Sequence, residues 1–258
     1  MTLKDFEYFS DGPWIAFASN NAPAKGSDTI RVSRRSFPND TIFDWKFPDV
    51  EGESVYSYVH LAWGNFVGGV AHKNDVIPTR IDRLASFTED LTFEMRGARD
   101  DYNVLSEMFP TLVAGDATTQ IAEVGVFRHA PPATRRYIRT GRPIGTVVES
   151  GRSWTVTQIT SGVSNPAYPK GLPFYVFTAR NPAAVQGRVD IRKLLEYLVA
   201  QGEIAGTAYI NGHGTGVEPI KGSGSLTIKN IQIRMTAKGD LPEPGRDNIP
   251  KEGFVGKE

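Results

Sequence analysis

The chain has 258 residues, a length that suits one large domain or two small ones. Its 29 basic and 29 acidic residues cancel, so no positive surplus exists to neutralise phosphates, which argues against a nucleic-acid-binding protein. The absence of cysteine excludes disulfides, thiolate catalysis, iron–sulfur clusters and cysteine-based zinc sites. A hydrophobic content of 40% is enough to bury a core at this size.

Neither a membrane span nor a targeting segment is visible. No run of 18 apolar residues occurs, so we expect no transmembrane helix and no membrane partner. Residues 1–10 (MTLKDFEYFS) lack the apolar stretch of a signal peptide. This leaves the compartment unknown, because the protein is either intracellular or a secreted chain whose leader has been removed.

Short β-type segments dominate the chain. The 26 glycines and 17 prolines together make up a larger share of the chain than the average of about 12% for these two residue types. Turn-forming residues occur at 11–13, 20–23 and 38–40. Alternation of apolar and polar side chains predicts strands in the following segments, in chain order: 54–61, 87–95, 102–109, 121–127, 154–159, 173–178, 207–211 and 225–235.

One segment, residues 190–201 (DIRKLLEYLVAQ), has the pattern of an amphipathic helix. Its Ile and Leu side chains recur at helical spacing, Asp190 suits the N-cap and Gly202 suits the position after the C-terminus. Many strands with one late helix predict an all-β fold of two packed antiparallel sheets, a sandwich or jelly roll, with the helix against the convex sheet. We expect this domain to span residues 1–238 and residues 239–258, rich in Pro, Gly and charge, to form an exposed tail.

Glu123 stands in the middle of an otherwise apolar strand. Period 2 places Glu123, Gly125 and Phe127 on one face, and the small aliphatic residues 122, 124 and 126 on the other, as a core face requires. A carboxylate in that position costs free energy unless water or a partner stabilises it. Glu123 is therefore either an exposed side chain on a solvated face or a functional carboxylate beside open space.

Two further glutamates have equally ordinary readings. Glu218 lies between glycines and before a proline, where the pattern suggests a tightly turned loop. Glu107 shares a strand face with Asn103 and Leu105, and would be a surface charge if that strand lay at a sheet edge. The four histidines show no metal-ligand spacing, and we expect neither a metal nor another cofactor.

These three glutamates lie in segments that together resemble glycoside hydrolase family 12, the endo-β-glucanase and xyloglucanase family. The resemblance runs in collinear order over residues 40–236. It rests on residues 103–109 (NVLSEMF), 123–127 (EVGVF), 143–145 (PIG) and 216–222 (GVEPIKG), on the helix at 190–198, and on the more weakly similar residues 43–45 and 55–58.

The resemblance implies an all-β jelly-roll sandwich of two curved antiparallel sheets with one helix packed on the convex side, and the activity of a retaining glycosidase. It implies Glu123 as nucleophile, Glu218 as acid/base and Glu107, where the family has Asp, as the group that orients the nucleophile. The substrate would be a polysaccharide or oligosaccharide of the β-glucan type. We expect the enzyme to be a monomer. We take as candidate substrate-binding residues the following: Trp14, Trp45, Tyr58, Asn103, Phe127 and Pro143.

Two departures from the family pattern bear on the substrate. Gly125 and Phe127 stand where the family has Met and Trp, which predicts a roomier and less flat groove and a preference for a substituted or differently linked glycan over plain carboxymethylcellulose. The Arg-rich stretch 128–142 is read as a loop, either solvated or capping the groove; its arginines are Arg128, Arg135, Arg136, Arg139 and Arg142.

Two other functions stay open at this point. A non-catalytic, lectin-like carbohydrate-binding jelly roll would need neither Glu123 nor Glu218, and a structural sandwich such as an assembly subunit would make the carboxylate pair a coincidence. The position of the two carboxyls relative to each other distinguishes these alternatives from an enzyme.

Overall fold

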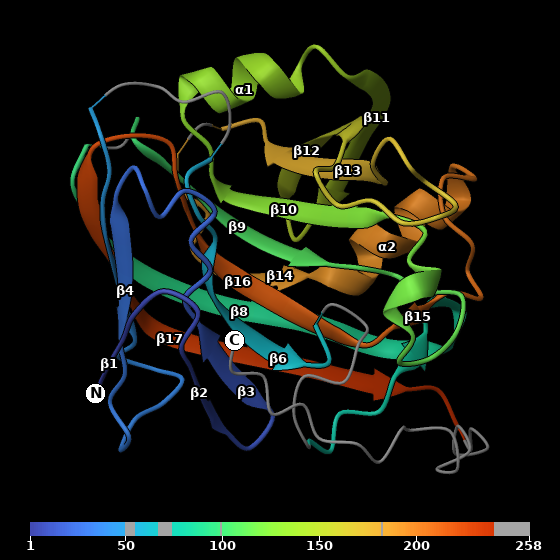
Figure 1. The fold of residues 1–258 in the computed structure, drawn as a ribbon. Coiled ribbons are helices and arrows are strands. Elements are labelled where there is room, and N and C mark those ends of the chain that lie inside the picture. Colours follow the sequence, from blue (N-terminus) through green and yellow to red (C-terminus); the bar gives the residue numbers. More distant parts are fainter. Residues whose placement is uncertain (50–54, 67–73, 99, 182, 240–258) are drawn as a thin grey trace.

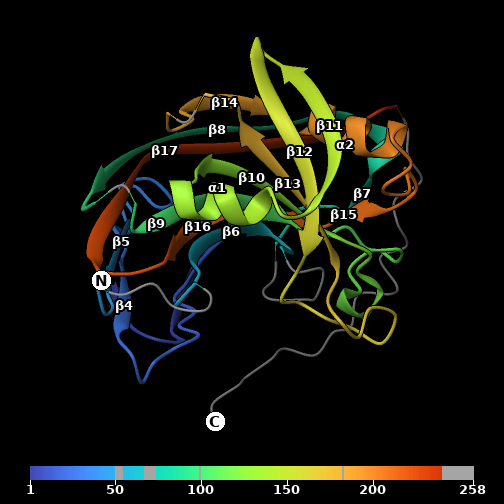
Figure 2. The ribbon, with the colours of Figure 1, turned by 90° about the horizontal axis from the view of Figure 1, so that it is seen from above.

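The computed structural model describes residues 1–49, 55–66, 74–98, 100–181 and 183–239. Within these residues two large sheets pack face to face (Figures 1 and 2), which confirms the jelly-roll prediction. A two-stranded ribbon of β7 (Thr79–Arg80) and β15 (Tyr209–Ile210) lies beside them. Neither α-helix of this part of the chain is long and apolar enough to cross a membrane.

The outer sheet has six strands. In spatial order they are β1 (Thr2–Leu3), β4 (Ser27–Arg31), β5 (Ile42–Lys46), β17 (Ser223–Ala237), β8 (Leu84–Arg96) and β14 (Gly187–Asp190). The long pair β8 and β17 forms its spine, and both were predicted from their alternation, over residues 87–95 and 225–235.

The inner sheet has nine strands and is curved (Figure 2). Their order is β11 (Arg142–Glu149), β12 (Arg152–Thr160), β13 (Pro173–Ala179), β10 (Glu123–His129), β9 (Tyr102–Met108), β16 (Gly212–Pro219), β6 (Val59–Gly64), β3 (Trp14–Phe17) and β2 (Tyr8–Asp11). The sheet is antiparallel except for β10 and β13, which pair in parallel. That exception departs from the prediction, and it arises because a helix and the β11–β12 hairpin lie between the two strands in the chain.

Period-2 alternation decides which side chains of the inner sheet enter the core. On β9, the side chains of Tyr102, Val104 and Met108 lie in the apolar core between the sheets, so Asn103 and Glu107 point to the opposite, concave face. On β10, Val124 and Val126 enter the core in the same way, which turns Glu123 to the concave face. The alternation read from the sequence is confirmed for both strands.

The core between the sheets consists of two apolar clusters, both rich in aromatic side chains. One centres on Phe87, Trp154 and Phe177, and the other on Phe43 and Trp45. Each large apolar side chain removed from water stabilises the fold by about 1.5–3 kcal/mol, so these two clusters hold the sheets together.

Helix α2 (Ile191–Ala200) confirms the predicted helix. The Asp190 side chain accepts a hydrogen bond from the Lys193 amide at 3.3 Å, and Gly202 adopts φ +73° just beyond the C-terminus. The Leu194 and Leu198 side chains are fully buried in the core, and the helix packs against β8 and β11. It thereby extends the outer layer over the convex face of the wider inner sheet (Figure 1).

Several local predictions were wrong or incomplete. A second helix, α1 (Pro132–Ile138), occupies part of the stretch read as a loop, and Pro at its first position suits a helix start. Two 3₁₀ turns, Ile81–Arg83 and Ala117–Thr119, were not predicted. The strand expected at 54–61 begins at Val59, and residue 54 lies outside the described residues. So does the predicted tail, apart from Gly239.

Strand β16 corrects the reading of Glu218 as a loop residue. The glycines before Glu218 do not mark turns; they lie in an extended strand where neighbouring groups approach closely. A Cβ added at Gly214 would lie 2.6 Å from the Phe66 ring, and one at Gly216 would lie 2.3 Å from the Val59 carbonyl oxygen.

Replacing Gly216 with Ala should therefore destabilise the fold. The Val59 carbonyl belongs to the paired strand β6 and cannot move aside cheaply, so we expect a loss of about 1–3 kcal/mol in the free energy of unfolding, measured by urea titration. Gly162 is the matched control, because an added Cβ there meets nothing within 4 Å. Equal stability of the Gly216→Ala and Gly162→Ala variants would contradict the packing argument.

Candidate active site

Three carboxyl side chains converge on the concave face from three adjacent strands. Glu123 comes from β10, Glu107 from the central strand β9, and Glu218 from β16. Glu107 lies opposite Gly125 on one side and Gly214 on the other, while Glu218 lies opposite Asn103. Glu107 and Glu123 are only 6% and 7% exposed, and Glu218 is half-buried. Glu107 is therefore not the surface charge of an edge strand.

Glu123 is held by two hydrogen-bond donors. The Ser161 hydroxyl donates to its Oε2 atom, and the Val163 amide in turn donates to the Ser161 oxygen at 2.9 Å. The Glu107 carboxyl forms the second hydrogen bond to Glu123. Burial is the largest effect and leaves the pKa of Glu123 above its ordinary value, although both hydrogen bonds lower it by stabilising the ionised form.

Glu107 carries the proton of this pair. Burial raises its pKa well above the ordinary value, and the nearby Glu123 and Glu218 charges raise it further. A protonated Glu107 can donate to the Glu123 carboxylate, so the two groups share one negative charge rather than repelling each other.

Glu218 has a different environment. The Asn103 Nδ2 group donates to its Oε2 atom at 3.0 Å, and the Thr134 hydroxyl of α1 donates to Asn103 Oδ1 at 2.7 Å, which fixes the orientation of the amide. Burial raises the pKa of Glu218 to about 7, with the hydrogen bond from Asn103 lowering it and the Glu123 charge raising it. At neutral pH Glu218 is thus partly protonated.

Tyr58 borders the same group of side chains. Its hydroxyl donates to the Leu105 carbonyl oxygen at 3.3 Å, and its ring stacks on His60 with centroids 4.8 Å apart. Burial, followed by the Glu107 and Glu218 charges, raises the phenol pKa well above its ordinary value. His60 is kept neutral, because burial lowers its pKa to about 4.

This arrangement places on one face of a sheet a carboxyl, Glu123, whose ionised form accepts two hydrogen bonds, and a second carboxyl, Glu218, whose pKa burial raises to about 7. Such a pair can act as a nucleophile and a general acid in one reaction. In the part of the chain that the structure describes, no three His, Asp or Glu side chains gather as ligands for a metal ion.

The structure separates the six candidate substrate-binding residues. Tyr58 and Asn103 lie beside the glutamates. Trp14 and Trp45 instead point into the core between the sheets, and Trp45 packs edge-on against Tyr102 at 4.8 Å, so neither can contact a substrate on the concave face. Pro143 is exposed on β11, at the outer edge of the inner sheet.

Phe127 lies on the concave face but is covered. It packs in an apolar cluster with Phe174 and with Ile138 of α1. The space expected at Gly125 is also filled, since an added Cβ would lie 2.7 Å from the Phe174 ring. The prediction of a roomier groove at Gly125 and Phe127 is therefore wrong, because a side chain distant in sequence occupies that space.

The Arg-rich stretch is neither a loop nor uniformly solvated. Arg128 is buried in the core, on the face of β10 opposite Glu123. Arg135 of α1 donates to the Ala130 and Ala179 carbonyl oxygens, and Arg142 pairs with Glu203. Helix α1, which contains Arg135 and Arg136, packs through Ile138 on the apolar cluster of the concave face, and whether the stretch caps the groove stays a prediction.

Three residues near the site were missed in the sequence: Ser161, Thr134 and Phe174. Ser161 follows the predicted strand at 154–159 and Thr134 lies on an unpredicted helix, so no periodic pattern singled them out. Phe174 belongs to a predicted strand, but only the sheet order reveals that it lies next to Gly125.

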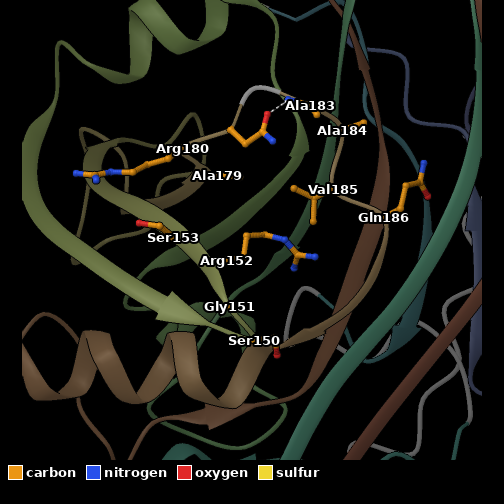
Figure 3. Close-up of a pocket in the computed structure, with 11 residues that line it drawn as sticks. Ser150, Gly151, Arg152, Ser153, Ala179, Arg180, Ala183, Ala184, Val185 and Gln186 are labelled. Atoms are coloured by element: carbon orange, nitrogen blue, oxygen red, sulfur yellow. Dashed lines mark hydrogen bonds between the residues drawn. The ribbon is translucent and has the colours of Figure 1, made fainter.

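A cavity of about 680 Å³ lies elsewhere, between the β11–β12 hairpin and the segment before β14 (Figure 3). Its lining includes Arg152, Arg180 and Gln186 and none of the three glutamates. Arg152 and Arg180 extend in opposite directions in Figure 3, so they do not form a joint anion-binding pair. The concave face remains the candidate site.

Comparison with known proteins adds evidence on the fold. No protein-family model and no curated protein matches the sequence.

Solved structures do match, each aligned with 92% of this chain. A family 12 xyloglucanase from Bacillus licheniformis is 18% identical, with a TM-score of 0.71 over 100% of its chain. Endoglucanase Cel12A from Rhodothermus marinus is 15% identical, with a TM-score of 0.74 over 100% of its chain. Endoglucanase 3 of family GH12 from Trichoderma harzianum is 20% identical, with a TM-score of 0.68 over 97% of its chain. The chain therefore has the jelly-roll fold of the family 12 glycoside hydrolases.

Proposed function

We propose that the protein is a retaining glycoside hydrolase that cleaves a β-glucan-type polysaccharide with Glu123 as nucleophile and Glu218 as acid/base. One observation carries the proposal: two carboxyls share the concave face, and Glu123 accepts two hydrogen bonds that favour its ionised form while Glu218 has its pKa raised to about 7 by burial. The hydrogen bonds to Glu123 come from Ser161 and Glu107, and the raised pKa keeps Glu218 protonated up to about pH 7. The shared fold of enzymes that act on such glycans supports it.

The mechanism follows from these protonation states. The Glu123 carboxylate attacks the anomeric carbon while Glu218 gives its proton to the departing glycosidic oxygen, which yields a covalent glycosyl-enzyme. Glu218, now ionised, removes a proton from a water molecule. That water attacks the anomeric carbon, releases Glu123 and restores the proton on Glu218.

Glu107 serves this cycle as a positioning group. It is protonated when Glu123 is ionised, and its hydrogen bond orients the Glu123 carboxylate. Asn103 holds Glu218 in the same way, and the neutral Tyr58 beside them offers a hydroxyl and a ring to the sugar at the bond to be cleaved.

The pH dependence should follow Glu218. We expect kcat/KM to fall about tenfold per pH unit above pH 7, because the acid must be protonated and its pKa is about 7. The Asn103→Ala variant loses a hydrogen bond that favours the ionised form of Glu218, so the pKa of Glu218 should rise. The decline of kcat/KM on the basic side of the pH profile should then begin at higher pH. If this decline begins at the same pH or at a lower pH in the variant, Glu218 is not the acid.

Hydrolysis of a panel of glycans, followed by product analysis, tests the proposal. The panel would include carboxymethylcellulose, mixed-linkage β-glucan, xyloglucan and a β-1,3-glucan. Release of reducing ends from at least one of them supports a glycosidase. Binding without hydrolysis would indicate the lectin-like alternative, and neither binding nor hydrolysis would favour a structural sandwich.

A further inference from the structure

A charged cluster lies in the core directly behind the three glutamates. Glu89 projects from β8 of the outer sheet into the interior, and Arg128 projects from β10 to meet it. Both side chains are completely buried. An ion pair taken fully out of water costs free energy that its own attraction often fails to recover, so its presence in an otherwise apolar core calls for an explanation.

Glu89 is bonded to each strand that carries a concave-face glutamate. From β9, the Ser106 hydroxyl donates to its two carboxylate oxygens at 3.0 and 2.8 Å. From β10, Arg128 Nε donates to Oε2 at 3.1 Å, and the Arg128 Nη2 group also donates to that oxygen. From β16, the Thr215 hydroxyl donates to Oε1, and His213 Nε2 lies 3.3 Å from the same oxygen.

These donors are close in sequence to the glutamates on the other face of the sheet. Ser106 directly precedes Glu107, and Thr215 lies three residues before Glu218 on one strand. Arg128 lies on the same strand as Glu123, and its Nη1 group also donates to the Gly187 carbonyl oxygen of β14 at 3.1 Å. One carboxylate of the outer sheet thus contacts three neighbouring strands of the inner sheet.

The cluster holds a fixed charge rather than a titrating one. Burial by itself raises the pKa of Glu89, but Arg128, His213 and the Thr215 hydroxyl together bring it below its ordinary value. The charged or titratable side chains that face Glu89 are Arg128 from β10 and His213 from β16. Its negative charge also reaches Tyr58, where it adds to burial and the Glu107 and Glu218 charges in raising the phenol pKa.

We propose that Glu89 is a positioning residue, which through Ser106, Arg128 and Thr215 holds the strands of Glu107, Glu123 and Glu218 in catalytic register. This inference rests on the proposed function and extends it to a network in the core. A displacement of about 1 Å between reacting groups can cost on the order of 10²-fold in rate. Three strands tied to one carboxylate are fixed relative to each other more tightly than apolar packing alone would fix them.

A pair of double variants tests this. E89Q/R128M removes the charges together, leaves no unpaired charge in the core and releases β10. The control E149Q/R152M removes a second Glu–Arg pair, in which a buried Glu149 lies 3.6 Å from a partly buried Arg152, remote from the three glutamates. For each protein we would measure the thermal unfolding midpoint, kcat and KM on cellopentaose, and the Glu218 titration midpoint by carbon-13 NMR of labelled glutamate.

We expect E89Q/R128M to unfold cooperatively, with kcat at least about tenfold below the wild type and KM changed by less than about threefold. The Glu218 midpoint should fall towards its ordinary value, because burial is the main cause of its elevation and a displaced strand lets water in. The control should keep kcat within about twofold and the midpoint unchanged. Equal kcat and equal midpoints in the two double variants would overturn the proposal.

Two other outcomes are still informative. If E89Q/R128M does not fold, S106A/T215V keeps the ion pair but removes the hydroxyl hydrogen bonds from β9 and β16 to Glu89, and the same expectations apply to it. If the wild type hydrolyses none of the panel glycans, the proposed function fails. The positioning role is then judged on the Glu218 midpoint, which needs no turnover.

Discussion

Replacing Glu123 with Gln should abolish turnover on every glycan substrate, with kcat falling by roughly 10³-fold or more. The amide has the size of the carboxylate and can keep the hydrogen bond from Ser161, but it cannot form the glycosyl ester on which double displacement depends. The loss should therefore be equally severe for substrates with good and poor leaving groups. Initial rates on mixed-linkage glucan and on 2,4-dinitrophenyl β-cellobioside measure it.

Folding should be unaffected by this substitution, since Glu123 lies on the concave face and not among the core side chains. The matched control is Glu149→Gln, which alters a fully buried glutamate far from the three carboxyls and should keep most of the activity. Near-normal rates for Glu123→Gln, alongside a normal unfolding midpoint, would rule out Glu123 as the nucleophile.

Replacing Glu218 with Ala should give a loss that depends on the leaving group. On an unactivated glucan we expect kcat to fall about 10²–10⁴-fold, because the departing oxygen receives no proton. On 2,4-dinitrophenyl β-cellobioside the first step needs no acid help, so the glycosyl-enzyme should still form and only its hydrolysis should be slow. Pre-steady-state release of dinitrophenol separates these two steps.

Azide provides the complementary check on Glu218. A small anion can occupy the space left by the carboxyl and attack the glycosyl-enzyme without a general base, so azide should restore turnover of the activated substrate and yield a glycosyl azide. Azide should do nothing for Glu123→Gln. Equal losses on both substrates, with no response to azide, would assign Glu218 a structural role.

Much of the fold could be predicted from the sequence because its strands alternate and its one long helix has a clear apolar stripe. The same alternation placed Glu123 and Glu107 on the face away from the core, and that face is where the structure has them. What periodicity could not give was the environment of each carboxyl. Ser161 and Asn103 reach the glutamates from other parts of the chain.

The errors have a common physical cause. The glycines before Glu218 were interpreted as turns, and the space at Gly125 as part of the groove, whereas tertiary neighbours explain both. The Phe66 ring lies against Gly214 and the Phe174 ring against Gly125, so these glycines allow close packing. A glycine in a strand can mark a bend of the chain or a position where another group packs closely, and sequence spacing does not distinguish the two.

The buried ion pair was missed for a related reason. Arg128 comes directly after the predicted strand 121–127 and was interpreted as part of the next loop, whereas the strand continues to His129 and its alternation places Arg128 on the core face. Glu89 shares its strand face with Phe87 and Leu91, which are core residues. Glu89 and Arg128 have opposite charges and both lie on core-facing sides of their strands. A model that packed the two predicted strands against each other could have revealed the ion pair.

The stereochemistry of the first product tests the central claim most directly. Proton NMR of the reaction mixture within the first minutes, before mutarotation, identifies the anomer that is released. Double displacement by Glu123 and Glu218 predicts the β-anomer from a β-linked glucan, with retained configuration. Initial release of the α-anomer would show a single displacement by water and would contradict the account.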